Sequence, residues 1–312
     1  MIRLAILSLL LFTACGRSQR AVSTSSSADA GVVSVSAIGL SFEAPDSIPS
    51  GWVTFRFENE SPMTHFGTLE RMPDGIGVEE QQRQVAPVFQ DAMNLLNAGR
   101  RGAAIAKLGT LPEWNSRTVS WGGPGLTGPG GTCDATVRLA PGTYVMECYV
   151  KTGGVFHSYS PDPSRHGMVH QFTVTGEKSG APEPKPTLEI TISSQRGIQV
   201  TGQPVEGRNV VAVHFGDQAP HGNFVGHDVH LVALSDDVKI DSLVAWMDWM
   251  RPTGLQTPAP AEFVGGLEEM PAGQTGYLTV TLDPGRYAWI SEVPNADKKG
   301  MLRIFTVPGG AR

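Results

Sequence analysis

The chain has 312 residues, and this length predicts about two domains, each able to bury its own hydrophobic core. Only 17% of the residues are charged, whereas glycine (37) and proline (23) are abundant, which favours short strands joined by turns and therefore an all-β fold. The net charge is −6 without any cluster of Lys and Arg, so nucleic acid is excluded as a partner because such a surface repels phosphate.

Residues 1–14 have the pattern of a signal peptide, since Arg3 precedes an apolar run, LAILSLLLF, that is too short to span a bilayer. The next residues, FTACG, resemble the lipobox of bacterial lipoproteins, although Phe12 stands where that family usually has Leu, Val or Ile. The resemblance implies cleavage before Cys15 and a lipid on its thiol, which would attach the protein to a membrane; an ordinary secretory signal is the alternative. Residues 15–31 are Ser-rich and predict a flexible tether. The expected location is extracytoplasmic, on a bacterial membrane that is the outer one in a Gram-negative cell.

The remaining sequence repeats itself on either side of a break. GEKSGAPEPKPT, at 176–187, is rich in charge, Gly and Pro and predicts a linker between domains at 32–175 and 188–308. LAPGTY at 139–144 matches LDPGRY at 282–287. Three further pairs of segments also correspond: VTFRF with VAVHF, HFGTL with HDVHL, and HGMVHQFTV with KGMLRIFTV. Four matches predict a duplicated domain.

Each copy has mostly the period-two alternation of strands with one buried face, as in TCDATVRL and LTVTL. The L-x-P-G-x-Y segments predict a Tyr corner, in which the tyrosine hydroxyl bonds back to the backbone of a Greek-key sandwich. One helix is expected to interrupt each copy, GVEEQQRQVAPVFQDAMNLLNAG at 77–99 and KIDSLVAWMDWM at 239–250. The predicted fold is therefore two Greek-key β-sandwich domains, each with one inserted helix.

The first copy also carries an ordered set of residues that can bind a soft metal. A strand with an early His is followed by L-x-P-G-x-Y-x-x-x-C, a loop His, Gly-Met and a last strand, and this order resembles the cupredoxin (blue-copper) family. The resemblance covers both copies, but its ligand-like residues occur only in the first. It implies one copper held by His65, Cys148, His157 and Met168. A thiolate and two imidazoles suit both oxidation states of copper, and a long thioether contact tunes its potential.

Three alternatives remain open from the sequence. Ten residues separate His157 from Met168, where the family usually has only a few, so His166 could replace His157 as the second imidazole. Thiols outside the cytoplasm more often pair than stay free, and a Cys133–Cys148 disulfide would exclude copper. A buried, inert Cys148 is a third interpretation.

The second copy lacks these ligands, because Ser291 aligns with Cys148 and no His follows it. His227 and His230 form an H-x-x-H pair that would face one side only on a helix, whereas the pattern around them predicts a strand. The second copy is therefore expected to be structural or to serve in binding.

These observations predict a copper protein for electron transfer or copper handling, working with a redox or copper-donor protein. The alternative is a non-catalytic binding or scaffold lipoprotein without metal. We do not expect an enzyme, because Glu147 precedes Cys148 where copper oxidases and nitrite reductases have a His, and no H-x-H occurs.

Overall fold

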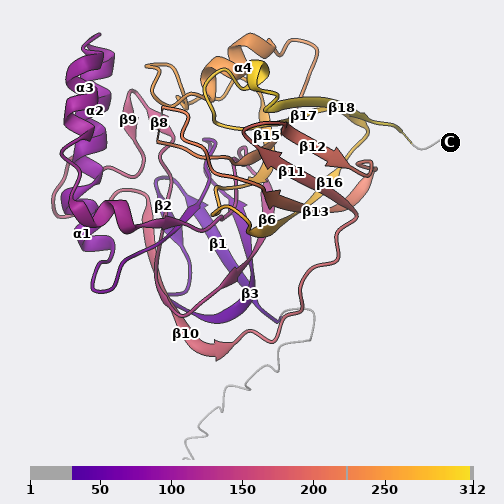
Figure 1. Cartoon of the computed structure of the whole chain (residues 1–312), viewed down its shortest axis with the longest axis horizontal. Helices are drawn as coiled ribbons and strands as arrows, with labels where there is room; N and C mark the ends of the chain where they lie inside the picture. Colours follow the sequence, from indigo (N-terminus) through magenta and orange to yellow (C-terminus); the bar gives the residue numbers. More distant parts are fainter. Residues whose placement is uncertain (1–29, 223, 310–312) are drawn as a thin grey trace, which may run out of the picture. The chain divides into compact units, whose positions relative to one another are not determined.

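The computed structural model describes residues 30–222 and 224–309, and from Gly31 onward the chain forms one compact unit (Figure 1). The predicted signal peptide, Cys15 and nearly all of the predicted tether lie outside the described residues. No helix in the described part of the chain is long and apolar enough to cross a membrane.

The first half of the chain forms two facing layers of strands. In chain order its strands are β1 (Val32–Ile38), β2 (Ser41–Glu43), β3 (Ser47–Asn59), β4 (Thr68–Arg71), β5 (Val119–Ser120), β6 (Thr132–Leu139), β7 (Gly142–Glu147), β8 (Lys151–Thr152), β9 (Val155–Phe156) and β10 (Val169–Lys178). β3 pairs with β1 and β6 in one layer, while β7 pairs with β10 and β4 in the other. Alternate residues of β3, Val53, Phe55 and Phe57, are fully buried and fill the space between the layers.

The second half repeats this arrangement. Its strands are β11 (Leu188–Ser193), β12 (Gly197–Thr201), β13 (Gly207–Phe215), β14 (Val229–Ala233), β15 (Glu262–Leu267), β16 (Thr275–Leu282), β17 (Gly285–Ile290) and β18 (Leu302–Val307). β13 pairs with β11 in parallel and with β16 antiparallel, as β3 does with β1 and β6. β17 lies between β14 and β18, as β7 lies between β4 and β10. The segments that match in sequence therefore have matching strand partners.

The two halves are joined by strand pairing as well as by the chain between them. β6 and β16 are antiparallel neighbours, with Thr136 opposite Tyr277, so one layer of each half continues into the other as a single sheet. Strand β10 extends to Lys178, into the segment expected to be a linker. The exact domain boundaries stay a prediction.

Both predicted Tyr corners are present. Tyr144 donates its hydroxyl to the carbonyl of Ala140 at 3.1 Å, and Tyr287 donates to Asp283 at 3.0 Å. Each bond ties a strand start to the turn four residues before it, which fixes the crossing from one layer to the other.

The helix prediction for the first half was wrong in number. Three helices, α1 (Val78–Gln84), α2 (Ala86–Asn97) and α3 (Arg101–Leu108), replace the single one expected. Pro87 cannot continue the hydrogen-bond ladder of α1 and instead starts α2, and Gly99, with φ of +71°, ends it. In the second half, α4 (Ile240–Trp246) lies within the predicted segment. The prediction of an all-β fold of sandwich-type sheets is confirmed.

Candidate copper site

Four of the predicted ligands lie on loops at one end of the first sandwich. His65 precedes β4, and its backbone N–H and C=O bond to Thr127 at 3.1 and 2.7 Å. Cys148 directly follows β7 and donates its N–H to the carbonyl of Met168 at 3.1 Å. Met168 in turn donates to the carbonyl of His157 at 2.6 Å. These backbone bonds fix the positions of the loops, so the ligand candidates are held by the frame of the fold.

The Gly-Met pair of this motif requires glycine at position 167. A Cβ on Gly167 would overlap the backbone of Ser158, so only glycine lets the returning loop approach this closely. The contact brings Met168 back beside His157 even though the loop between them is long. The ten residues between His157 and Met168, more than the family usually has, therefore form a loop that extends to the surface and returns.

Three side chains converge in the buried interior. Nδ1 of His65 lies 3.4 Å from Sγ of Cys148, Nδ1 of His157 lies 3.8 Å from the same sulfur, and the two Nδ1 atoms are 3.2 Å apart. Ligand distances of about 2.0–2.3 Å at trigonal or tetrahedral angles place ligand atoms about 3.3–3.8 Å apart. The triangle therefore has the size of a single metal site, and its donor set fits a type-1 copper ion.

Hydroxyl groups fix which nitrogen of each ring faces inward. Nε2 of His65 lies 2.9 Å from Oγ of Ser61, and Nε2 of His157 lies 2.9 Å from Oγ1 of Thr152. Thr152 lies 2.8 Å from the hydroxyl of Thr257, which itself donates to the carbonyl of Lys151 at 3.1 Å. Because the hydroxyl hydrogen of Thr257 is donated to Lys151, Thr257 accepts a hydrogen bond from Thr152. Thr152 in turn accepts a hydrogen bond from Nε2–H of His157. The lone pair of that ring is consequently on Nδ1, directed at Cys148.

Burial sets the charge of the three groups without metal. It lowers the pKa of His65 to about 4 and, with the nearby His65 ring, that of His157 to about 3, so both imidazoles are neutral near pH 7. Burial raises the pKa of the Cys148 thiol to about 12. The pocket thus offers two neutral nitrogen donors and one thiol that must lose a proton to bind metal.

Met168 and His166, the remaining candidates, have opposite surroundings. Met168 is fully buried and is hydrogen-bonded through its backbone to both Cys148 and His157. His166 is exposed, and its Nε2 contacts Glu79 at 3.3 Å. Of the two imidazoles that the sequence left open, the structure brings His157 to the cluster and places His166 on the surface.

The predicted disulfide alternative was wrong, because Cys133 and Cys148 are both free and buried. Cys133 lies on β6 and Cys148 after β7, and these consecutive strands belong to different layers. The sulfur of Cys133 instead lies 3.5 Å from the backbone of Gly266 in the second half. The Tyr corner between the strands therefore separates the two thiols.

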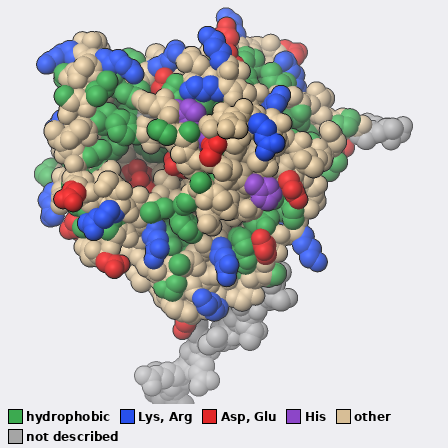
Figure 2. All heavy atoms as spheres, in the orientation of Figure 1, with side chains coloured by type: hydrophobic (Ala, Val, Ile, Leu, Met, Phe, Trp, Pro, Cys, Tyr) green, Lys and Arg blue, Asp and Glu red, His purple; other side chains and the backbone are tan. Residues whose placement is uncertain are grey.

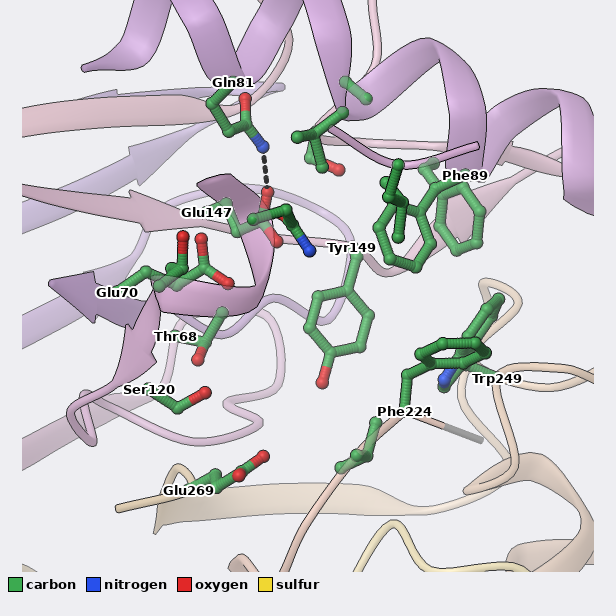
Figure 3. Close-up of a pocket in the computed structure, with 18 of the residues that line it drawn as sticks. Thr68, Glu70, Gln81, Phe89, Ser120, Glu147, Tyr149, Phe224, Trp249 and Glu269 are labelled. Atoms are coloured by element: carbon green, nitrogen blue, oxygen red, sulfur yellow. Dashed lines mark hydrogen bonds between the residues drawn. The ribbon is translucent and has the colours of Figure 1, made fainter. Parts of the chain in front are cut away.

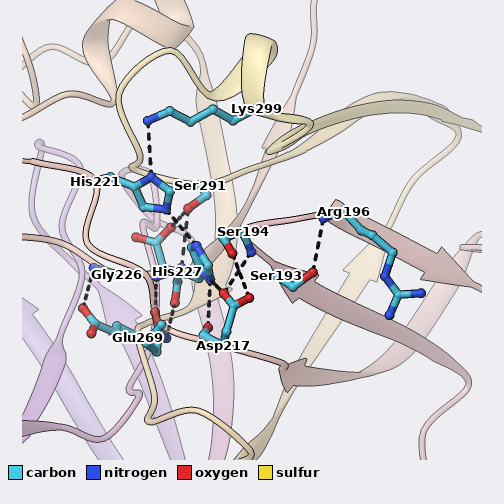
Figure 4. Close-up of polar contacts among 12 residues, drawn as sticks. Ser193, Ser194, Arg196, Asp217, His221, Gly226, His227, Glu269, Ser291 and Lys299 are labelled. Carbon is cyan, nitrogen blue, oxygen red and sulfur yellow. Dashed lines mark hydrogen bonds and ion pairs between the residues drawn. The ribbon is translucent and has the colours of Figure 1, made fainter.

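Ser291 occupies in the second half the backbone position that Cys148 has in the first. Ser291 donates its N–H to Met301 at 3.1 Å, which is the backbone bond that Cys148 makes to Met168, but its hydroxyl donates to Asp228 at 2.6 Å. The H-x-x-H pair does not converge. His227 faces His221, with 2.8 Å between Nε2 atoms (Figure 4), because residues three apart on an extended chain point to opposite sides.

A second group of potential ligands lies in this half, and the sequence did not single it out. Nε2 of His230 is 3.3 Å from Oδ2 of Asp228 and 3.7 Å from Oε1 of Glu292, all buried. The N–H of Leu126 donates to Nδ1 of His230 at 3.1 Å, so this nitrogen is already engaged. Burial and then Asp228 raise the pKa of Glu292 well above its usual value. Asp228, His230 and Glu292 are close enough together to hold a metal ion, with Nε2 of His230 facing the two carboxyl groups.

No family model and no curated protein matches the chain. Three of the similar solved structures are of copper proteins. Auracyanin A, a "blue" copper protein from Chloroflexus aurantiacus, is 22% identical over 46% of this chain and 98% of its own, with a TM-score of 0.25. A multicopper oxidase is 13% identical over 88% and 87%, with a TM-score of 0.20. The Cu-containing nitrite reductase (NirK) from Thermus scotoductus SA-01 is 13% identical over 90% and 62%, with a TM-score of 0.22.

The expectation that this chain is not an enzyme is corrected by these comparisons. Two of the three structures are enzymes. At these TM-scores the matches assign no family.

Proposed function

We propose that the first half of the protein binds one copper ion through His65, Cys148 and His157, with Met168 as a weak axial ligand, and uses it for one-electron transfer or copper handling. The residues fit this ion by type, since a thiolate, two imidazoles and a thioether are the donors of blue-copper centres. Copper would supply a single-electron redox couple at this position.

One observation carries the proposal. The two Nδ1 atoms, 3.2 Å apart, and Sγ of Cys148, 3.4 and 3.8 Å from them, form a buried triangle of the size that a single metal ion needs. The outer nitrogen of each ring bonds to a hydroxyl group, so both Nδ1 atoms face the cluster.

The surrounding residues suit a redox role because they hold the ligands in place. Ser61 and Thr152 orient the rings, and backbone bonds fix Cys148 and Met168, so little rearrangement accompanies a change of charge. Thr152 is exposed and bonds directly to His157, so a single hydroxyl group separates this ring from solvent. An electron would have a short path between the ion and a partner at that surface.

We further propose that the protein is extracytoplasmic and anchored to a bacterial membrane by a lipid on Cys15, and that a redox or copper-donor protein is its partner. The lipobox-like FTACG supports the lipid anchor. The exposed Thr152, which bonds to His157, supports a partner protein that approaches the site at this surface.

The test is an absorption spectrum of the purified protein after addition of Cu(II). We expect an intense visible band from thiolate-to-copper charge transfer, lost in Cys148→Ser and kept in Cys133→Ser, its matched control. His157→Ala should abolish the band and His166→Ala should leave it. A protein that takes up no copper, or whose band survives Cys148→Ser, would contradict the proposal.

A further inference from the structure

A cavity of ≈ 230 Å³ lies beside the copper cluster, between the two halves of the chain. Its walls come from β4 and β7, from α1 and α2, and from loops of the second half that carry Phe224, Trp249, Glu268 and Glu269 (Figure 3). In the space-filling view, the face beside the helices is hollowed, and acidic side chains lie inside the hollow (Figure 2). This cavity has no part in the proposed copper ligation.

Four carboxyl groups line one side of it. Glu70 on β4 and Glu147 on β7 come from paired strands, and Glu268 and Glu269 approach from the second half. No Lys or Arg lines the cavity, and in the described part of the chain none forms an ion pair with any of these four groups. Burial raises the pKa of Glu70 and of Glu269 to about 7, so above that pH both are carboxylates that attract positive charge.

Glu268 also lines the cavity, and its side chain is only 1% exposed. Its Oε1 lies 3.9 Å from Nδ1 of His230 and has no hydrogen-bond partner among the described residues. A buried carboxyl oxygen without a donor is costly, and native proteins usually satisfy it with a partner, a water or a ligand. Two of the other three groups have a donor: Gln81 donates to Glu147, and Gly226 donates to Glu269.

Aromatic rings form the opposite side. Trp249 contacts Phe89 and Phe156, each with 5.8 Å between ring centroids, and Phe224 lies 6.5 Å from Phe89 at the exposed rim. A bare metal ion would use the carboxylates and leave this wall without a function. An organic cation uses both sides, because its ammonium group pairs with carboxylates while its body packs on the rings.

We propose that this cavity binds a small organic amine, with its ammonium group at Glu70, Glu147 and Glu268 and its apolar body against Phe89 and Trp249. Its position gives the site a link to the copper cluster. Glu147 and Tyr149 line the cavity, and the residue between them in sequence is Cys148, whose side chain points into the copper cluster. A bound amine would therefore lie beside the two residues that flank Cys148 in sequence.

Calorimetric titration of the copper-free protein with 2-phenylethylamine at pH 8 tests the proposal. We expect saturable binding, and binding at least about tenfold weaker for 2-phenylethanol, which has the same body without the charge. Glu70→Gln and Glu268→Gln should each weaken amine binding about tenfold, and Glu43→Gln, an exposed carboxylate on β2, should not. Quenching of tryptophan fluorescence should follow the same curve.

Equal binding of the alcohol would overturn the proposal in favour of an apolar cavity, and tight Mn²⁺ binding that excludes the amine would overturn it in favour of a metal site. No binding of the amine by a correctly folded protein would also overturn it. Cys148→Ser should bind the amine like the wild type, so the outcome does not depend on whether the copper proposal is correct.

Discussion

Tyr149 donates its hydroxyl to Oε2 of Glu292 at 3.0 Å, and these two residues occupy the same position in the two repeats. Tyr149 follows Cys148, and Glu292 follows Ser291, whose N–H bonds to Met301 as that of Cys148 bonds to Met168. Phe66 and Asp228, which follow the matched His65 and His227, also correspond to each other. Phe66 packs on Tyr149, with 4.5 Å between ring centroids, and Asp228 accepts from the N–H of Glu292 at 2.8 Å. The two halves thus contact each other through equivalent positions, which carry aromatic side chains in the first half and acidic side chains in the second.

Tyr149→Phe should lower the free energy of unfolding by about 1 kcal/mol, because a hydrogen bond to a buried carboxyl group is lost without a change of shape. Urea denaturation measures this difference. Tyr159→Phe is the control, since Tyr159 is half-buried and no hydrogen bond of its hydroxyl is found within the described residues. Equal effects of the two changes would show that the Tyr149 contact contributes nothing specific to stability.

Copper uptake should release one proton per ion at pH 7. The pKa of Cys148 is raised to about 12, so the thiol is protonated, whereas the lowered pKa values of His65 and His157, about 4 and 3, leave both rings neutral. Only the thiol then loses a proton, and the apparent affinity rises about tenfold for each pH unit. Titration calorimetry in buffers with different heats of ionisation counts the protons. A count near zero, or of two or more, would contradict these protonation states.

The sequence predicted those features that depend on local pattern. Alternation gave the strands, L-x-P-G-x-Y gave the two corners that Tyr144 and Tyr287 form, and the order of His, Cys, His and Met gave the cluster. The choice between His157 and His166 could not be made, because it depends on how the loop folds back against Gly167. Residues that act across the halves were missed entirely: Thr257 bonds to Thr152 from 105 residues away, and no local signal marks it.

Glu70→Gln should stabilise the protein at pH 8 and do so much less at pH 5. Burial, and then the neighbouring Glu269, raise the pKa of Glu70 to about 7, against an ordinary value of 4.5. A raised carboxyl pKa means that the folded state holds its proton more tightly, so stability falls as pH rises from about 4.5 to about 7. The amide avoids this loss, and we expect a gain of about 1 kcal/mol because the group is only partly buried.

Thermal unfolding at the two pH values measures this difference, with Glu43→Gln as the control. Neutral His65 and His157 act in the opposite direction, since their lowered pKa values destabilise the folded state as pH falls below about 6.5. The comparison must therefore be between variant and wild type at each pH. A gain at pH 5 equal to that at pH 8 would show that the effect of Glu70→Gln is not one of charge.

Thr152→Val should weaken copper binding about tenfold while the fold is kept. The hydroxyl of Thr152 accepts the Nε2 proton of His157, and valine has the same shape without an acceptor, so the ring loses the contact that directs its Nδ1 lone pair into the cluster. Thr257→Val is the graded control: it removes the next hydroxyl in the chain but leaves Thr152 able to accept from His157, and its effect should be several-fold smaller. Competition with a chromophoric chelator measures both affinities. If the two variants weakened binding equally, or if neither did, the hydroxyl chain would have no role in orienting His157.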